Sequence, residues 1–105
     1  MVIKTVPYCN QDATWGTGLD FFNCNPGPQT AKVSFYNEAG ALIKTIGLSF
    51  NPYAHVSMGK SEIGIVGRFS VVVESSNTVF VTGLMYNQGG LSSLPVYEVP
   101  GAIKN

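Results

Sequence analysis

His55 is the only histidine in this chain of 105 residues, so any catalytic system that needs an imidazole base has to use it. A serine or cysteine nucleophile requires such a base within hydrogen-bond reach. No G-x-S-x-G turn accompanies His55, and one histidine with two distant cysteines does not match the usual spacing of zinc ligands. We therefore predict no catalytic triad and no metal site, and interpret His55 as an exposed residue on a short strand.

The carboxylates are scattered along the chain and form no evident catalytic pair. A glycosidase needs two carboxyl groups about 5 to 9.5 Å apart in a cleft. Asp12 and Asp20 could meet across the loop that carries Trp15, but acidic loop residues are ordinarily solvated. Residues 10–12 also lack the regular oxygen-ligand spacing of a calcium loop. The sequence thus predicts a protein that is not an enzyme and that needs no cofactor.

Cys9 and Cys24 are the only cysteines, and each lies at the end of one of the first two predicted strands. If those strands are neighbours, a disulfide would close the loop between them and stabilise the fold by roughly 3 kcal/mol. The alternative is two reduced thiols that fill space as small apolar groups. Because the chain starts without a secretion signal, we favour thiols, and the spacing is not that of a CxxC redox motif.

Aromatic residues fall near predicted strand ends and loops, where their rings have two possible roles. Exposed rings can stack on the faces of sugars or anchor a protein partner, whereas buried rings would close the two open ends of a sandwich. Trp15 stands between Thr14 and Gly16 in a polar loop, where a core residue is less expected. The candidates for binding a ligand or partner are Trp15, Tyr8, Tyr53, Tyr86 and His55.

The elements that must hold these residues are predicted to be strands. The segment 69–83 contains two β-branched and aromatic runs joined by the polar turn 75–78, which predicts a β-hairpin. A second hairpin is expected where the alternating segment 31–36 turns at Gly40, with a bulge or strand end near 43–44. Further strands are predicted over 2–8, where Pro7 requires a sheet edge or strand end, and over 19–24, 41–50, 54–58 and 94–99.

The remaining segments are predicted to connect these strands. We expect a surface loop over 10–18, a connection between sheets over 59–67, and a flexible loop over 89–93. Helix is nearly excluded, and its closest candidate, 60–66, is interrupted by Gly64. About seven to eight short strands with turn signals at about every 8 to 12 residues predict an all-β protein, an immunoglobulin-like antiparallel β-sandwich, as one domain over residues 1–105.

The composition limits the partners. Charged residues make up only 11% of the chain, and six basic residues balance six acidic ones. No basic stripe is present to neutralise nucleic-acid phosphates, and no apolar run approaches the roughly 20 residues of a membrane span. A surface with so few charges has little to repel a copy of itself, which favours a homo-oligomer. The start of the chain predicts a cytoplasmic protein, although a secreted domain whose signal had been removed would look the same.

The order of elements from Phe22 to Asn87 resembles the sensory rhodopsin transducer family and related small sandwich domains of bacterial surface proteins. The shared features are an Asn-rich turn, Phe-Asn-Cys-Asn-Pro-Gly-Pro, a strand ending in the acidic turn Asn-Glu-Ala-Gly, a bend at Phe-Asn-Pro, and the segment Val-Val-Val-Glu-Ser-Ser-Asn-Thr-Val. The resemblance implies a β-sandwich that forms oligomers, commonly tetramers, and acts as a non-catalytic adaptor or ligand-binding module.

One departure from that family argues against a rhodopsin or DNA partner. The transducer-like proteins carry several basic residues along the strand after the proline bend, whereas residues 52–58 contain only His55. Two functions follow as hypotheses. The first is a sandwich that self-associates and binds a protein partner or small ligand without catalysis. The alternative is a carbohydrate-binding or cell-surface assembly module from a secreted protein, which predicts a Cys9–Cys24 disulfide and an exposed Trp15.

Overall fold

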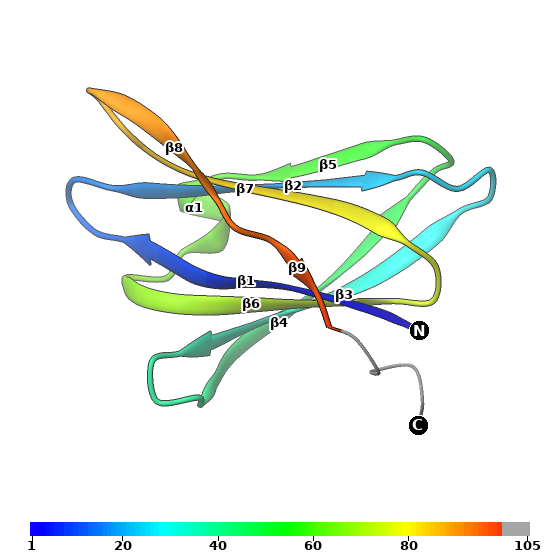
Figure 1. The fold of residues 1–105 in the computed structure, drawn as a ribbon, viewed down its shortest axis with the longest axis horizontal. Coiled ribbons are helices and arrows are strands. Elements are labelled where there is room, and N and C mark those ends of the chain that lie inside the picture. Colours follow the sequence, from blue (N-terminus) through cyan, green and yellow to red (C-terminus); the bar gives the residue numbers. More distant parts are fainter. Residues whose placement is uncertain (100–105) are drawn as a thin grey trace.

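In the computed structural model, which describes residues 1–99, two antiparallel sheets face each other across a single core (Figure 1). Sheet A has the strand order β4-β3-β6-β1-β9, and sheet B has the order β5-β2-β7-β8. The predicted all-β antiparallel sandwich is therefore confirmed. The elements are β1 (Val2–Gln11), β2 (Gly16–Asn23), β3 (Gln29–Asn37), β4 (Leu42–Phe50), β5 (His55–Met58), α1 (Lys60–Ile63), β6 (Gly67–Ser75), β7 (Val79–Asn87), β8 (Gly90–Leu94) and β9 (Tyr97–Glu98).

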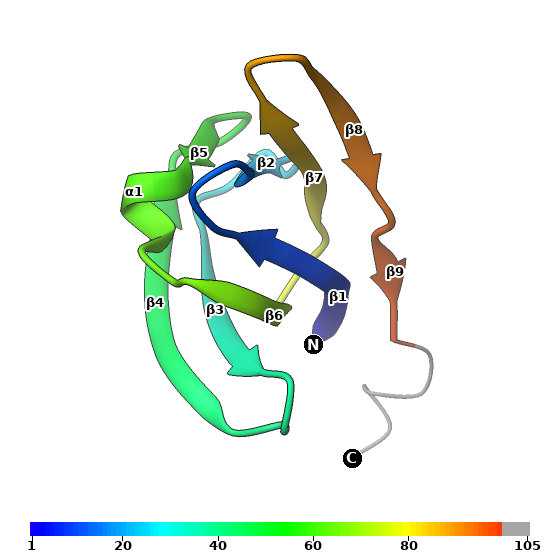
Figure 2. The ribbon, with the colours of Figure 1, turned by 90° about the vertical axis from the view of Figure 1, so that its left-hand side faces the viewer.

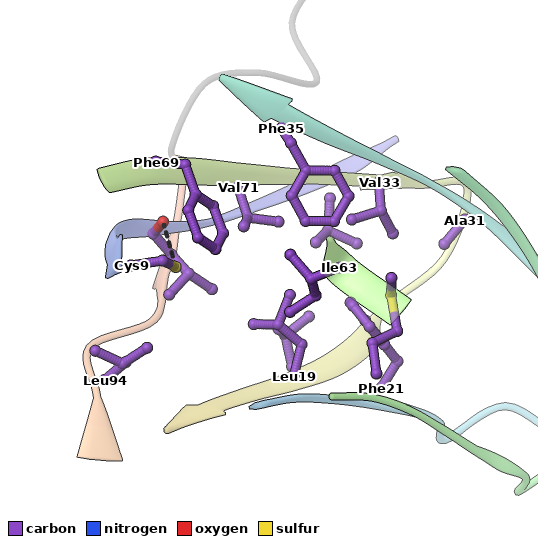
Figure 3. Close-up of a cluster of buried hydrophobic side chains, with 14 of the residues drawn as sticks. Cys9, Leu19, Phe21, Ala31, Val33, Phe35, Ile63, Phe69, Val71 and Leu94 are labelled. Carbon is purple, nitrogen blue, oxygen red and sulfur yellow. Dashed lines mark hydrogen bonds between the residues drawn. The ribbon is translucent and has the colours of Figure 1, made fainter. Parts of the chain in front are cut away.

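The core is built by alternation, because every second side chain of a strand points to the same face of its sheet. In β6, Val71 and Val73 are buried, and their chain neighbours are more exposed. Figure 3 shows Ile63 of α1 between side chains of sheet A, such as Phe35, and side chains of sheet B, such as Leu19. The short helical turn thus supplies a fully buried plug between the two sheets.

The two sides of the sandwich are closed in different ways. Figure 2 shows α1 on the side where β4 and β5 end the two sheets, within the connection that leads from β5 to β6. This connection confirms the predicted crossing between sheets over 59–67. On the opposite side the chain passes from β8 in sheet B to β9 in sheet A, with Leu94 buried on the way.

The hairpin predicted over 69–83 is wrong, although both of its strands exist. β6 lies between β3 and β1 in sheet A, whereas β7 lies between β2 and β8 in sheet B. The chain therefore arches from one sheet to the other at 76–78. Alternation buries Val73 and Val79 in either arrangement, so the pattern alone does not distinguish paired strands from strands that face each other across a core.

Two smaller predictions also need correction. β1 does not end near Pro7 but continues to Gln11, because the register with β6 shifts between Val6 and Cys9 and accommodates the proline at this irregularity. The segment 89–93 is not a flexible loop. Most of it belongs to β8, which pairs with β7 from Asn87↔Gly90 to Gly83↔Leu94.

The second hairpin matches the prediction, including its irregularity. β3 pairs with β4 through a turn in which Gly40 has φ 85°, a conformation that favours glycine. Phe35 pairs with Lys44 and Tyr36 pairs with Leu42, so one extra residue, Ile43, lies in β4 where the bulge was expected. β5 confirms the short strand predicted over 54–58. The strand predicted over 94–99 is shorter than expected, because Leu94 ends β8 and β9 contains only Tyr97 and Glu98.

Buried amide side chains fasten both ends of β2. Gln11 is 2% exposed; its Nε2 donates to the carbonyl oxygens of Lys60 and Ile65, and its Oε1 accepts from the Thr17 N–H. At the other end, Asn23 is fully buried and donates through Nδ2 to the carbonyls of 27 and 51. No buried side-chain nitrogen or oxygen in residues 1–99 lacks a hydrogen-bond partner.

Within the same residues, no helix has the length and apolar character needed to cross a membrane.

Candidate functional site

An array of three aromatic rings lies on the outer face of sheet B, and we call Phe22, Phe80 and His55 the aromatic patch. The three residues occupy neighbouring strands, because Phe22 of β2 pairs with His55 of β5 on one side and with Phe80 of β7 on the other. The centroids of the Phe22 and His55 rings are 4.7 Å apart, with a tilt of 33°. The Phe22 and Phe80 rings are nearly parallel, at 6° and 6.5 Å.

The patch is partly open to solvent, because its two outer rings are exposed and the central ring of Phe22 is half-buried. Phe80 is 52% exposed, and the side chain of His55 is 62% exposed. The outward orientation of Phe22 follows from strand alternation. Its neighbour Phe21 is fully buried in the core, so the side chain of Phe22 must lie on the opposite face of the sheet. Large apolar rings gathered on the solvent face of a sheet are the kind of exposed surface that marks a binding site in soluble proteins.

A polar row lies directly beside the patch, two residues further along the same strands. Asp20 of β2 pairs with Ser57 of β5, and the Ser57 hydroxyl donates to Asp20 Oδ1 at 2.7 Å. His55 Nε2 lies 4.0 Å from the other oxygen of the same carboxylate, Oδ2. The Asp20 side chain is 41% exposed, so its carboxylate also has room to accept hydrogen bonds from a ligand.

A cation flanks the patch from the other sheet. Lys4 of β1 places its Nζ 4.8 Å from the centroid of the Phe80 ring, within the range of a cation–π contact. The patch therefore has an ammonium group on the side of Phe80 and a carboxylate beside His55. The aromatic surface therefore has a hydrogen-bond donor, the ammonium group, and a hydrogen-bond acceptor, the carboxylate, at its margin.

Ser57, Asp20 and His55 have the residue types of a catalytic triad but not its order. In a triad the histidine stands between the hydroxyl and the carboxylate and takes the hydroxyl proton. Here the carboxylate stands between the other two, and no hydrogen bond joins Ser57 to His55 in the described part of the chain. The described residues also contain no group of three or more His, Cys, Asp or Glu side chains that could hold a metal ion.

The structure places one of the five predicted binding residues, His55, in the patch. Trp15 and Tyr86 lie at the opposite end of sheet B, and both are half-buried. Tyr86 covers Gly16, where an added Cβ would lie 2.7 Å from the ring, and its hydroxyl accepts from the Lys60 N–H. These contacts give Tyr86 a clear packing role.

The other two predicted residues are exposed but lie apart from each other. Tyr53 is 60% exposed in the turn before β5, where it has φ 59°. Tyr8 is 47% exposed on β1 in sheet A, at a hollow of about 300 Å³ that Glu38 and Arg68 also line. The five predicted residues therefore do not form one site.

Phe22, Phe80, Asp20 and Ser57 were not predicted as site residues. A signal was present for the two phenylalanines, since each stands at the outward position of an alternating strand: Phe22 follows Phe21, and Phe80 lies between Val79 and Val81. The sequence does not show that β5, β2 and β7 are adjacent, and this adjacency is what brings the rings together.

Both cysteines are free thiols in the structure. β1 and β2 lie in different sheets, so the strands that would have carried a disulfide are not neighbours. Cys9 is fully buried, with its thiol directed to the Val6 carbonyl (Figure 3), and burial raises its pKa to about 12. Cys24 is half-buried, and its Sγ lies 3.3 Å from the Thr78 carbonyl oxygen.

Comparisons with known proteins bear on the fold. No family model matches the sequence, and no curated protein matches it. Among solved structures, the chain is similar to the crystal structure of Thermotoga maritima 1070, with a TM-score of 0.72 and 11% identity over 93% of this chain and 90% of that one. At this identity the likeness concerns the fold alone: the chain shares the architecture of that protein over nearly its whole length.

Proposed function

We propose that this protein is a non-catalytic, self-associating module that binds a small ligand on the outer face of sheet B. The observation that carries the proposal is the aromatic patch. Three neighbouring strands there place the exposed Phe80 and His55 and the half-buried Phe22 on the outer face, where alternation ordinarily places polar residues. Exposed aromatic rings are costly on a surface that has no partner, so their clustering points to binding.

The chemistry of the patch favours a sugar as the ligand. A pyranose has an apolar C–H face, which suits the flat aromatic surface, and hydroxyl groups at its edge, which suit the polar row. Asp20 offers carboxylate oxygens to those hydroxyls, and Lys4 offers an ammonium group on the other side of the patch. A binding role of this kind requires neither a metal nor an activated nucleophile.

A titration followed by NMR tests this proposal. Oligosaccharides of glucose, mannose, galactose and N-acetylglucosamine are added to the 15N-labelled protein, and glycerol serves as the negative control. We expect at least one sugar to shift the amide resonances of β5, β2 and β7 around Phe22, Phe80 and His55. A panel that shifts none of these resonances would contradict the proposal.

Variants make the test specific to the patch. The double substitution Phe22→Ser and Phe80→Ser removes the two phenylalanine rings and leaves the inward-facing residues of both strands in place. Tyr97→Ser is the matched control, because Tyr97 is 56% exposed on β9 of the other sheet. Binding should be lost in the double variant and kept in the control, and unchanged binding in the double variant would overturn the assignment of the site.

The self-associating part of the proposal is supported by the charge composition. Only 11% of the residues are charged and the net charge is zero, so two copies meet little electrostatic repulsion. Sedimentation velocity over a range of protein concentrations tests it directly. A strict monomer at the highest concentration would refute this part and leave the ligand site to stand on its own test.

A further inference from the structure

The edges of the two sheets differ greatly in length. Among the strands of residues 1–99, four lie at a sheet edge: β9 and β4 in sheet A, and β5 and β8 in sheet B. β9 has two residues, β5 has four and β8 has five, whereas β4 has nine. Natural sheets keep their edges short because the unpaired N–H and C=O groups of an edge strand form a template for another strand. Within the described part of the chain, β4 is the long edge strand that departs from this rule.

The outer edge of β4 has no hydrogen-bonding partner within residues 1–99. Its backbone pairs with β3 from Leu42 to Phe50, and no other strand, side chain or turn bonds to the backbone of this segment. Figure 2 shows β4 at the margin of sheet A, with its length running along the side of the molecule. Half of its backbone polar groups therefore remain available to a partner.

β4 carries few of the devices that protect an edge: the bulge at Ile43 and the charge of Lys44 lie at its start, and the residues from Thr45 to Phe50 have none. It contains no proline, and its only charged residue is Lys44. That side chain does not extend across the edge: its Nζ lies 5.7 Å from the centroid of the Phe35 ring and 3.4 Å from the Glu62 carbonyl oxygen. Gly47 has no side chain to flank the edge, which is the kind of position where another backbone can approach closely at mid-strand.

We propose that the β4 edge pairs antiparallel with β4 of a second copy, which joins the two five-stranded sheets into one continuous sheet across a two-fold axis. The inference rests on the self-association in the proposed function and names its surface. Two copies of one strand are self-complementary in an antiparallel pair, as a two-fold interface requires. Because Lys44 is the only charged residue of β4, like charges lie opposite each other only in the register that pairs Lys44 of one copy with Lys44 of the other.

This interface leaves the ligand site free. The aromatic patch lies on β5, β2 and β7 of sheet B, and β4 belongs to sheet A. A dimer formed along β4 would therefore present two patches to solvent. The two proposals can be tested independently, because a substitution on β4 does not change any residue of the patch.

The test places a charge on the edge and compares it with the same charge elsewhere. Gly47→Lys and Ser49→Lys put lysines at exposed positions of β4, and Thr82→Lys puts one at an exposed position of β7, an interior strand of sheet B. By sedimentation velocity we expect each edge variant to weaken the dimer by about tenfold or more, and the Thr82 variant to associate like the wild type. Circular dichroism and thermal unfolding show that each variant is folded.

Amide hydrogen exchange provides a second measurement that needs no substitution. Backbone N–H groups of 42–50 that point away from β3 should exchange more slowly as the protein concentration rises through the association range. A wild-type dimer that persists in both edge variants, or that dissociates in the Thr82 variant, would overturn the β4 interface. A wild-type monomer would overturn both this inference and the self-association, and the sugar titration would be unaffected.

Discussion

The two cysteines lie in different surroundings, and this difference is measurable at the level of single residues. Cys9 is fully buried and its thiol pKa is raised to about 12 by burial, so it carries no thiolate near neutral pH and lies out of reach of reagents. Cys24 is only half-buried, directly after the end of β2.

We expect one thiol per chain to react with Ellman's reagent in the native protein and two to react after unfolding in guanidinium chloride. Cys24→Ser should remove the fast-reacting thiol, whereas Cys9→Ser should leave it. The absence of any free thiol in the unfolded, unreduced protein would show a disulfide and revive the secreted alternative.

The β1–β2 connection depends on one carboxylate. Asp12 Oδ1 accepts from the Thr14 and Trp15 N–H groups at 2.8 Å each, and Oδ2 accepts from the Asn10 amide at 3.1 Å. The backbone hydrogen bonds from Trp15 and Thr14 are the largest causes that hold the pKa of this carboxyl below its ordinary value. The ionised form therefore stabilises the folded state.

The lowered pKa of Asp12 predicts how the stability of the protein depends on pH. A carboxyl whose pKa is lower in the folded state contributes stability above its unfolded pKa of about 3.9, and that contribution is lost as the pH falls through the folded value. Asp12→Ala should thus be less stable than the wild type at pH 6, and the difference should narrow as the pH falls below about 4. Urea unfolding across this range measures it, and a difference that stays constant would contradict the assignment. Asp12→Asn, which keeps an acceptor but no charge, separates the hydrogen bonds from the charge.

At the level of elements, Gln11 connects β1 to β2 and to the loop after α1. Its side chain satisfies the Thr17 N–H and the Ile65 carbonyl in a buried setting, with a further bond to the Lys60 carbonyl. A buried donor or acceptor that loses its partner costs about 1 to 3 kcal/mol. Because several buried backbone groups depend on the Gln11 side chain, we expect it to contribute substantially to the free energy of unfolding.

Gln11→Leu keeps a similar volume but leaves those backbone groups unpaired, and we expect it to lower the free energy of unfolding by about 2 to 4 kcal/mol. Gln88→Leu is the matched control, because Gln88 is exposed in the β7–β8 turn and the same change there should cost less than about 0.5 kcal/mol. Equal losses in urea denaturation would contradict the proposed role of Gln11.

Most of the elements could be predicted from the sequence, whereas their pairing could not. Alternation in β3 and the turn at Gly40 identify a true hairpin, and the position of Lys44 indicates the bulge beside it. The same kind of pattern around Val73 and Val79 predicts a hairpin where the chain instead arches between sheets, because burial on one face is common to both arrangements. The aromatic patch could not be predicted for the same reason: it exists only because β5, β2 and β7 are neighbours.

At the level of the whole molecule, the two sheets have separate proposed tasks. Sheet B presents the aromatic patch and its polar row, and sheet A has the long free edge of β4. The connections between the sheets are fastened by buried amides and by the plug residue Ile63. Such a framework can hold a pre-formed binding surface rigid, which lowers the entropic cost of binding a small ligand.

The most direct test of the ligand site is an intermolecular NOE experiment on the protein with the sugar that shifts its spectrum most. The account predicts contacts between the C–H protons of the bound sugar and the ring protons of Phe22 and Phe80. Contacts to Trp15 or Tyr8 in place of these rings would contradict it, as would a titrated sample in which no protein ring proton comes close to the sugar.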